Sequence, residues 1–403
     1  MGTLKARPAG AEARATSPHL GRLSLHNYRN FEELECDFPA SGVAITGPNG
    51  SGKTNLLEAI YYLQVFRSFR GARDAELIRF GEDVFRIEGE VAGEGTVAAA
   101  YERSTRRKKV VRDRREADRL SDAIGAVGAV AFRLDDVEIV RGGPAERRRY
   151  MDVHLSLTEP GYLNALQRYR QVLGQRNEAL RAGAPGPLID AWTDGLVADG
   201  ARLMAARSRW IDRRAESFAD YYASISGSAS AGLVYGPALG AGSVAQATAG
   251  DDDVCNAPET GGAESKWGER LEVAFGAARP AESRRGMTLV GPHRDELRIR
   301  RRPPGKESRA LRRYGSSGQQ RTGALALRLI EADALTEKLG REPLYLLDDV
   351  FAELDEERCK RLLALLEDGR SGQVILTAPK PGDIRMRGGG LPRWGIRNGS
   401  LLT

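Results

Sequence analysis

The sequence predicts an α/β fold in which two parts of mixed strand and helix, here called the head, flank an inserted helical segment, here called the arm. A glycine-rich loop at 47–54 separates an apolar, strand-like run from a helix-like run. From Pro144 the composition changes to Arg, Ala, Leu, Glu and Gln, with apolar residues at three- and four-residue spacing, which is typical of amphipathic helices. Residues 286–403 return to alternating helix and buried strand.

Four segments are expected along the chain: a disordered basic leader at 1–20, an N-terminal head part at 21–144, a helical arm at 145–285, and a C-terminal head part at 286–403. The leader lacks the apolar stretch of a secretory signal. Residues 224–265 are rich in Gly, Ala and Ser and predict a flexible loop that begins with a short strand.

Within these segments, apolar periodicity predicts the individual elements. Strands are expected at 23–35, 43–45, 85–91, 96–101, 127–132, 232–235, 287–290, 344–347 and 374–376. Helices are expected at 55–63, 145–157, 160–182, 187–222, 266–278 and 321–339. The apolar repeat of the arm does not keep a strict seven-residue spacing, which argues against a long coiled coil.

The bulk composition excludes several classes of protein. No uninterrupted apolar run is long enough to cross a bilayer, so no membrane is expected among the partners. Cys36, Cys255 and Cys359 are scattered without C-x-x-C spacing, which fits a reducing cytoplasm and argues against structural zinc. The net charge of +6 favours a polyanionic partner.

Much of the positive charge falls into two clusters, at 103–115 and at 298–313. Each cluster on its own fits a solvated hairpin tip as well as it fits a nucleic-acid contact. A nucleotide-binding motif in the same chain favours nucleic acid.

The loop at 47–54 fits the pattern G-x-x-x-x-G-K-[ST] without a mismatch. Its glycines let backbone amides point at phosphate oxygens, Lys53 adds a cation, and the Thr54 hydroxyl is a ligand for Mg²⁺. The loop therefore predicts a bound nucleoside triphosphate with Mg²⁺. Its residues, all candidate phosphate-binding groups, are Gly47, Pro48, Asn49, Gly50, Ser51, Gly52, Lys53 and Thr54.

A second candidate site lies directly ahead of the helix at 321–339, in the run Ser316, Ser317, Gly318, Gln319 and Gln320. Locally, this run predicts a helix cap with a capping box between Ser317 and Gln320. A Ser-x-Gly-Gln run at a helix start also resembles the signature loop of ABC-type ATPases. That resemblance implies that its serine, glycine amide and helix dipole grip the γ-phosphate of ATP held on the opposing subunit.

The apolar run at 344–347 ends in two carboxylates, Asp348 and Asp349. Such a run fits a strand buried on both faces of a mostly parallel sheet. Asp348 is placed to hold Mg²⁺ through water, opposite Thr54, and Asp349 to orient and deprotonate the attacking water. The next run, 352–355, stands where ABC-type ATPases carry the loop that crosses the dimer interface.

Together these elements resemble the ABC-type heads of the SMC and DNA-repair ATPases, and more narrowly the RecF family. The blocks that carry the narrower resemblance are 27–31, 47–58, 67–78, 142–152, 291–295 and 315–322, in the family's order between residues 21 and 385. The resemblance implies an ABC-type P-loop ATPase head, with a mixed sheet, flanking helices and a second β lobe, and an inserted α-helical arm.

The resemblance also implies a function. ATP and Mg²⁺ would drive homodimerisation on DNA, single-stranded or in gapped or junction duplexes, without reading its sequence. Weak, slow, DNA-dependent ATP hydrolysis would then release the DNA, so that the protein acts mainly as a DNA-binding switch. The implied task is recombinational repair, replication restart and the SOS response in the cytoplasm, with RecR and RecO as partners.

Some positions depart from the family pattern or allow several roles. Residues 132–136 stand where RecF proteins usually show a proline–glutamate pair, and Thr377 stands where many ABC-type ATPases place a switch histidine. His293 is expected to make local hydrogen bonds rather than to act as a base. Arg147–Arg149 fit three roles: lining DNA, pairing with acids across a dimer, or capping the arm.

Other functions share part of this pattern. The nucleotide-binding subunit of a membrane transporter has the same loop, signature and paired acids, but it needs a far shorter insertion than the one between Lys53 and Gly318. An SMC-like tether would need long heptads in the arm. A small-molecule kinase has no use for the Ser-Gly-Gln run.

Overall fold

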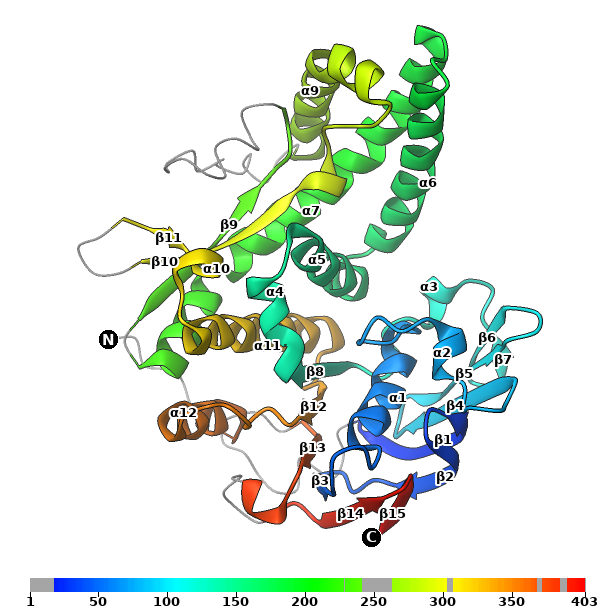
Figure 1. Ribbon diagram of the computed structural model, residues 1–403, viewed down its shortest axis with the longest axis vertical. Coiled ribbons are helices and arrows are strands. Elements are labelled where there is room, and N and C mark those ends of the chain that lie inside the picture. Colours follow the sequence, from blue (N-terminus) through cyan, green and yellow to red (C-terminus); the bar gives the residue numbers. More distant parts are fainter. Residues whose placement is uncertain are drawn as a thin grey trace. The chain divides into compact units, whose positions relative to one another are not determined.

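The computed structural model describes residues 18–227, 229–240, 263–302, 307–367, 372–384 and 390–402 (Figure 1). The predicted leader and most of the predicted loop at 224–265 lie outside the described residues. The chain divides into two compact units, here called the head (1–136 and 331–403) and the arm (137–330). Among the described residues, no helix is both long enough and apolar enough to cross a membrane.

One six-stranded sheet of the head runs in the order β15-β14-β3-β13-β12-β8. Its strands are β3 (Gly42–Thr46), β8 (Ala129–Arg133), β12 (Leu344–Asp348), β13 (Val374–Ala378), β14 (Arg393–Arg397) and β15 (Ser400–Leu402). All neighbours pair in parallel except β15, which lies antiparallel to β14 at the edge. Strands from residues 42–133 and 344–402 therefore lie in one sheet, which confirms the prediction that both ends of the chain build the head.

A second, antiparallel sheet of the head has the order β2-β1-β4-β5-β6-β7. Its strands are β1 (Leu20–Tyr28), β2 (Phe31–Asp37), β4 (Val84–Val91), β5 (Gly95–Glu102), β6 (Arg107–Arg112) and β7 (Arg115–Glu116). The single strand predicted at 23–35 is wrong: the backbone turns at Asn27 and Arg29, with φ of 49° and 57°, and forms a hairpin. Strand β6, inside the first basic cluster, has no clear apolar signal.

Helix α1 (Lys53–Val65) follows the glycine-rich loop and packs against both sheets of the head. It touches β8, β12 and β13 of the parallel sheet and β1, β4 and β5 of the antiparallel sheet. Most of its residues are consequently buried, so α1 lacks the polar face of a surface helix. Shorter helices α2 (Asp74–Leu77), α3 (Leu120–Ala123) and α12 (Glu356–Glu367) complete the head.

The arm is mainly helical. Its helices are α4 (Val137–Arg141), α5 (Pro144–Thr158), α6 (Tyr162–Arg181), α7 (Gly186–Ser226), α9 (Ala263–Arg285) and α10 (Leu311–Tyr314). Figure 1 shows α6 and α9 beside the long α7, and all three pack together. A three-stranded sheet in the order β11-β10-β9 lies against α7, from β9 (Ser230–Gly236), β10 (Glu296–Arg302) and β11 (Arg309–Ala310).

The division of the chain differs from the predicted boundary at 285/286. Strand β10 pairs with β9 along its whole length, from Glu296 opposite Gly236 to Arg302 opposite Ser230. This pairing ties residues 286–330 to the arm, and the second boundary falls inside helix α11 (Ser317–Leu339). Short-range patterns in the sequence carry no information about a pairing across so long a separation.

The strand predicted at 287–290 is also wrong. Side chains bind two backbone donors of this run: Asn177 Oδ1 accepts from the Thr288 N–H at 2.8 Å, and Glu282 Oε1 accepts from the Leu289 N–H at 2.8 Å. The Glu282 carboxylate is fully buried and is balanced by Arg176, which donates at 2.7 Å and is equally buried. Residues 287–290 therefore form an irregular segment, which the buried Arg176–Glu282 ion pair helps to hold in place.

We expect Arg176→Met to lower the free energy of unfolding by about 3–5 kcal/mol, because it leaves the buried Glu282 carboxylate without its counter-charge. Arg213→Met is the matched control, since Arg213 is 59% exposed and faces Glu159 at 3.5 Å. The control should cost about 1 kcal/mol or less. Urea unfolding of both variants measures the difference; equal losses would contradict a structural role for the buried pair.

Candidate nucleotide site

The conformation of the glycine-rich loop requires glycine at two positions, Gly47 and Gly52. A Cβ atom at Gly47 would lie 2.3 Å from the Ile396 carbonyl oxygen. Gly52 has φ of 114°, and a Cβ atom there would lie 2.6 Å from Nδ2 of Asn30. Gly50 has φ of 80° with open space beside it. The loop thus packs closely on one side and leaves its backbone accessible on the other.

Asn30 anchors this loop from the β1–β2 hairpin, a role that the sequence pattern alone does not indicate. Its Nδ2 donates to the Ser51 carbonyl at 3.1 Å, and its Oδ1 accepts from Asn55 at 2.7 Å. The Gly399 N–H donates to the same Ser51 carbonyl at 3.1 Å. The turn that splits the predicted strand at 23–35 therefore places Asn30 against the loop.

Lys53 and Ser51 supply the polar groups of the loop. Lys53 Nζ is buried and donates to the carbonyl oxygens of Gly47 at 2.7 Å and Pro48 at 3.1 Å. The Ser51 Oγ atom is buried and has no hydrogen-bond partner within the part of the chain that the structure describes. A buried hydroxyl without a partner is costly, which fits a site shaped for a further polar group.

Thr54 and Asp348 meet at the carboxyl edge of the parallel sheet. The Thr54 hydroxyl donates to Asp348 Oδ1 at 3.0 Å. Thr377, at the end of β13, donates to the same oxygen at 2.9 Å. Thr377 thus holds the first of the two paired acids.

Asp349 follows β12 in a left-handed conformation, with φ of 49°. Its backbone N–H donates to the Thr377 hydroxyl at 3.3 Å, which fixes the turn. Among the described residues, its buried Oδ1 atom has no hydrogen-bond partner. An acceptor held in this way suits a water molecule or a hydrated cation.

Both paired acids have raised pKa values. Burial is the main cause for Asp348, partly opposed by the hydrogen bonds from Thr377 and Thr54. For Asp349, burial comes first and the neighbouring charge of Asp348 second. Two carboxylates held together against their own repulsion favour a cation beside them.

The candidate signature lies at the start of α11, in the arm. Its capping box is shifted by one residue from the prediction: Ser316 pairs with Gln319, through Gln319 N–H to Ser316 Oγ at 3.3 Å and Ser316 N–H to Gln319 Oε1 at 3.0 Å. Gln320 instead donates to the carbonyls of α10. Ser317 is therefore not the cap and stays exposed, together with Ser316.

The loop at 352–355 precedes α12 in the head. Asp355 accepts from the Arg358 N–H at 2.9 Å and so caps this helix. Glu353 has φ of 67°, which turns the chain sharply out of the preceding segment. The segment 132–136 makes a local ion pair, Arg133 to Asp136 at 3.5 Å, in the place of the family's proline–glutamate pair.

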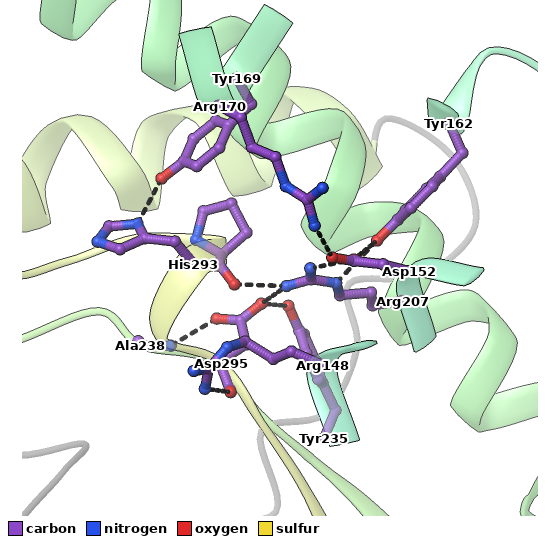
Figure 2. Close-up of polar contacts among 11 residues, drawn as sticks. Arg148, Asp152, Tyr162, Tyr169, Arg170, Arg207, Tyr235, Ala238, His293 and Asp295 are labelled. Carbon is purple, nitrogen blue, oxygen red and sulfur yellow. Dashed lines mark hydrogen bonds and ion pairs between the residues drawn. The ribbon is translucent and has the colours of Figure 1, made fainter. Parts of the chain in front are cut away.

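A buried polar network in the arm uses the block at 291–295 (Figure 2). Arg207 donates to Asp152 Oδ1 at 2.7 Å and to Asp295 Oδ2 at 2.8 Å. Tyr162 and Tyr235 donate to these two carboxylates in turn. The network joins α5, α6, α7 and β9 to the segment before β10, so this family block stabilises the arm.

His293 lies beside this network and pairs with Tyr169, as Figure 2 shows. Its Nδ1 atom lies 2.8 Å from the Tyr169 hydroxyl and its Nε2 atom 3.3 Å from the Thr288 carbonyl. Burial lowers its pKa to about 4. The ring is therefore neutral at physiological pH and makes local hydrogen bonds, in line with the sequence-based expectation.

Of the three arginines at 147–149, Arg147 has the clearest role. It is buried and grips Glu296 with two bonds of 2.6 and 2.9 Å. It also donates to the Gly142 and Val140 carbonyls at 2.8 and 3.2 Å, which caps α4. Arg148 donates to the Asp295 carbonyl at 2.9 Å, whereas Arg149 is exposed. For Arg147, the arm-capping role is the one that the contacts support.

The chain matches the family model described as RecF/RecN/SMC N terminal domain over residues 19–385. A DNA replication and repair protein RecF from Bacillus subtilis (strain 168) is 34% identical over 393 residues, covering 95% of this chain and 100% of that protein. Its counterpart from Salinibacter ruber is 35% identical over 373 residues, covering 90% and 85%.

Solved structures agree with these matches. The structure described as the recombination mediator protein RecF-ATPrS in the RecFOR pathway superimposes with a TM-score of 0.81 at 29% identity, covering 95% of this chain and 97% of that one. An Smc head domain from Pyrococcus furiosus gives a TM-score of 0.53 at 17% identity, covering 96% and 95%. This second likeness concerns the fold alone.

The raised pKa of Asp348 predicts a pH-dependent stability in magnesium-free buffer. The fold favours the protonated carboxyl, so this contribution is present near pH 3.8, the ordinary pKa, and is lost as the pH rises through the raised value. Asp348→Asn keeps the hydrogen-bond acceptor without the charge. Its stability relative to the wild type should therefore grow with pH, as measured by urea unfolding in EDTA.

Asp118→Asn serves as the control for this experiment, because Asp118 is an exposed carboxylate in the same unit. Its difference from the wild type should stay flat over the same pH range. A flat profile for Asp348→Asn as well would show that Asp348 is not held against its ionisation.

Proposed function

The chain belongs to the RecF family of SMC-like ABC-type ATPases, and from this premise we propose that it is an ATP-dependent DNA-binding switch in DNA replication and recombinational repair. The relatives reported above are named DNA replication and repair protein RecF. Their names support this function over that of a transporter subunit, which shares the motifs. The observation that carries the nucleotide part is the 3.0 Å contact of Thr54 with Asp348 beside the glycine-rich loop.

The loop residues fit the triphosphate of ATP. Backbone amides of 47–54, the Lys53 ammonium and the Ser51 hydroxyl supply donors for its phosphate oxygens. Thr54 and Asp348 supply oxygen atoms suited to Mg²⁺, directly or through water. Bound there, Mg²⁺ would neutralise phosphate charge.

Asp349 is the candidate general base. Its pKa is raised, which makes it a stronger base than an ordinary aspartate, and its Oδ1 atom has no partner among the described residues. Its left-handed turn is fixed by Thr377, so the carboxylate is held in place. We propose that it orients and deprotonates the attacking water during slow hydrolysis.

The signature completes the site from a second copy of the chain. Ser317 and Ser316 are exposed at the start of α11, where the helix dipole favours an anion. In this proposal each ATP is held by Lys53 of one chain and by Ser317 and Gly318 of the other. ATP binding drives dimerisation on DNA, and hydrolysis reverses it. RecR and RecO are the proposed partners at single-stranded gaps, in the cytoplasm.

A mixing experiment tests the shared site. Lys53→Met removes the phosphate-binding cation and Ser317→Arg blocks the signature, so each variant alone should sediment as a monomer with ATP. A mixture of the two can build one intact site per pair, from the loop of one variant and the signature of the other. We therefore expect dimers to reappear in the mixture, at lower affinity than in the wild type.

The same mixture with ADP is the control and should stay monomeric. A wild type that remains monomeric with ATP, or a mixture that never dimerises while the wild type does, would overturn the shared site. DNA binding measured with and without ATP tests the switch itself.

A further inference from the structure

The two basic clusters differ in how their charge is balanced. In the first, acids lie close to the basic groups: Lys108 is 2.8 Å from Asp74, Lys109 is 3.0 Å from Glu116, and Arg112 is 3.9 Å from Asp113. Each such pair lowers the positive field around its own basic group. Three carboxylates, Asp74 of α2 and Asp113 and Glu116 near the β6–β7 turn, therefore offset part of the first cluster's charge.

Among the residues of the second cluster whose side chains are described, Arg309, Arg312 and Arg313 are exposed, around α10. Within the described part of the chain, none of the three forms an ion pair with a carboxylate. Arg312 donates to the Arg141 carbonyl at 3.0 Å. The guanidinium groups of Arg309 and Arg313 lie 5.5 and 5.6 Å from the centre of the Tyr314 ring. Their positive charge is held in place but not cancelled.

Tyr314, the last residue of α10, is 49% exposed, whereas Leu311 at the start of the same helix is buried. A large aromatic side chain is more often buried than this. An exposed aromatic ring flanked by guanidinium groups provides both a stacking surface and phosphate-binding forks. A single-stranded nucleic acid offers both complements, an unpaired base and a phosphate on each side of it. A duplex offers only the phosphates.

We propose that Arg309, Arg312, Arg313 and Tyr314, here called the arginine–tyrosine surface, bind single-stranded DNA. This inference rests on the proposed function and assigns the surface through which it is carried out. Guanidinium groups contact the backbone and Tyr314 stacks on a base, neither of which reads sequence.

The surface adjoins the signature. Arg301 of β10 donates to the Tyr314 carbonyl at 3.3 Å and to Gln319 Oε1 at 3.2 Å. Gln319 closes the capping box with Ser316, so one arginine bridges the end of the DNA surface and the start of α11. Occupation of the surface by DNA therefore steadies the same short segment that presents Ser317 to ATP.

The test is the triple variant Arg309→Gln, Arg312→Gln and Arg313→Gln. Its matched control, Arg107→Gln, Lys109→Gln and Arg112→Gln, removes the same charge from the first cluster. Binding of labelled single-stranded oligonucleotide and of duplex is measured with ATP at several salt concentrations. We expect the triple variant to lose affinity and its logarithmic salt slope to fall by about 2–3, roughly one per lost phosphate contact. The control should bind almost as the wild type does.

Tyr314→Ala separates stacking from charge: it should weaken single-strand binding more than duplex binding. Sedimentation with ATP accompanies each variant. A triple variant that dimerises but binds DNA as well as the control overturns the arginine–tyrosine surface while leaving the proposed function intact. A wild type that neither dimerises nor binds DNA overturns the proposed function instead. Loss of ATP-dependent dimerisation in the triple variant would also overturn the inference, since the arginines would then act on the nucleotide site.

Discussion

The parallel pairing of β3, β13 and β12 is the constraint on which the rest of the head depends. In this register Asp348 lies opposite Thr377, and Thr377 lies opposite Ile45, two residues before the glycine-rich loop begins at Gly47. Three strands from distant parts of the chain therefore end in line. The loop, the acids and the threonine that joins them meet because parallel strands present their carboxyl ends at one edge.

The arm depends on a different interaction. Its core contains charged groups, above all Arg207 between Asp152 and Asp295. Such a network costs desolvation energy, and every member must be satisfied for it to hold a single arrangement. Here tyrosine hydroxyls and the Ala238 and Pro292 backbone complete it. We infer that the arm uses these polar contacts to fix how its helices meet β10.

The sequence predicted the elements whose signal is local. Helix α1, the buried strands β12 and β13, and the long helices of the arm follow from periodicity and from the glycine-rich loop. Two of the predictions that failed show why local patterns are insufficient. The capping box was placed one residue late, because Ser316–Ser317 and Gln319–Gln320 offer two equivalent registers. The predicted end of the arm, at residue 285, lies too early in the sequence, because the pairing of β9 with β10 joins segments that no local pattern relates. Asn30 lies in the family-like block at 27–31, but only the structure shows that its side chain contacts the glycine-rich loop.

The alternation of strands from both chain ends in the parallel sheet has a consequence for biosynthesis. Strand β3 lies between β13 and β14, which leave the ribosome last. Because chains emerge from the N-terminus onward, the arm is complete while β3 still has no neighbours. The glycine-rich loop cannot take its final shape until translation nears its end, so a truncated product would carry a folded arm without a working nucleotide cradle.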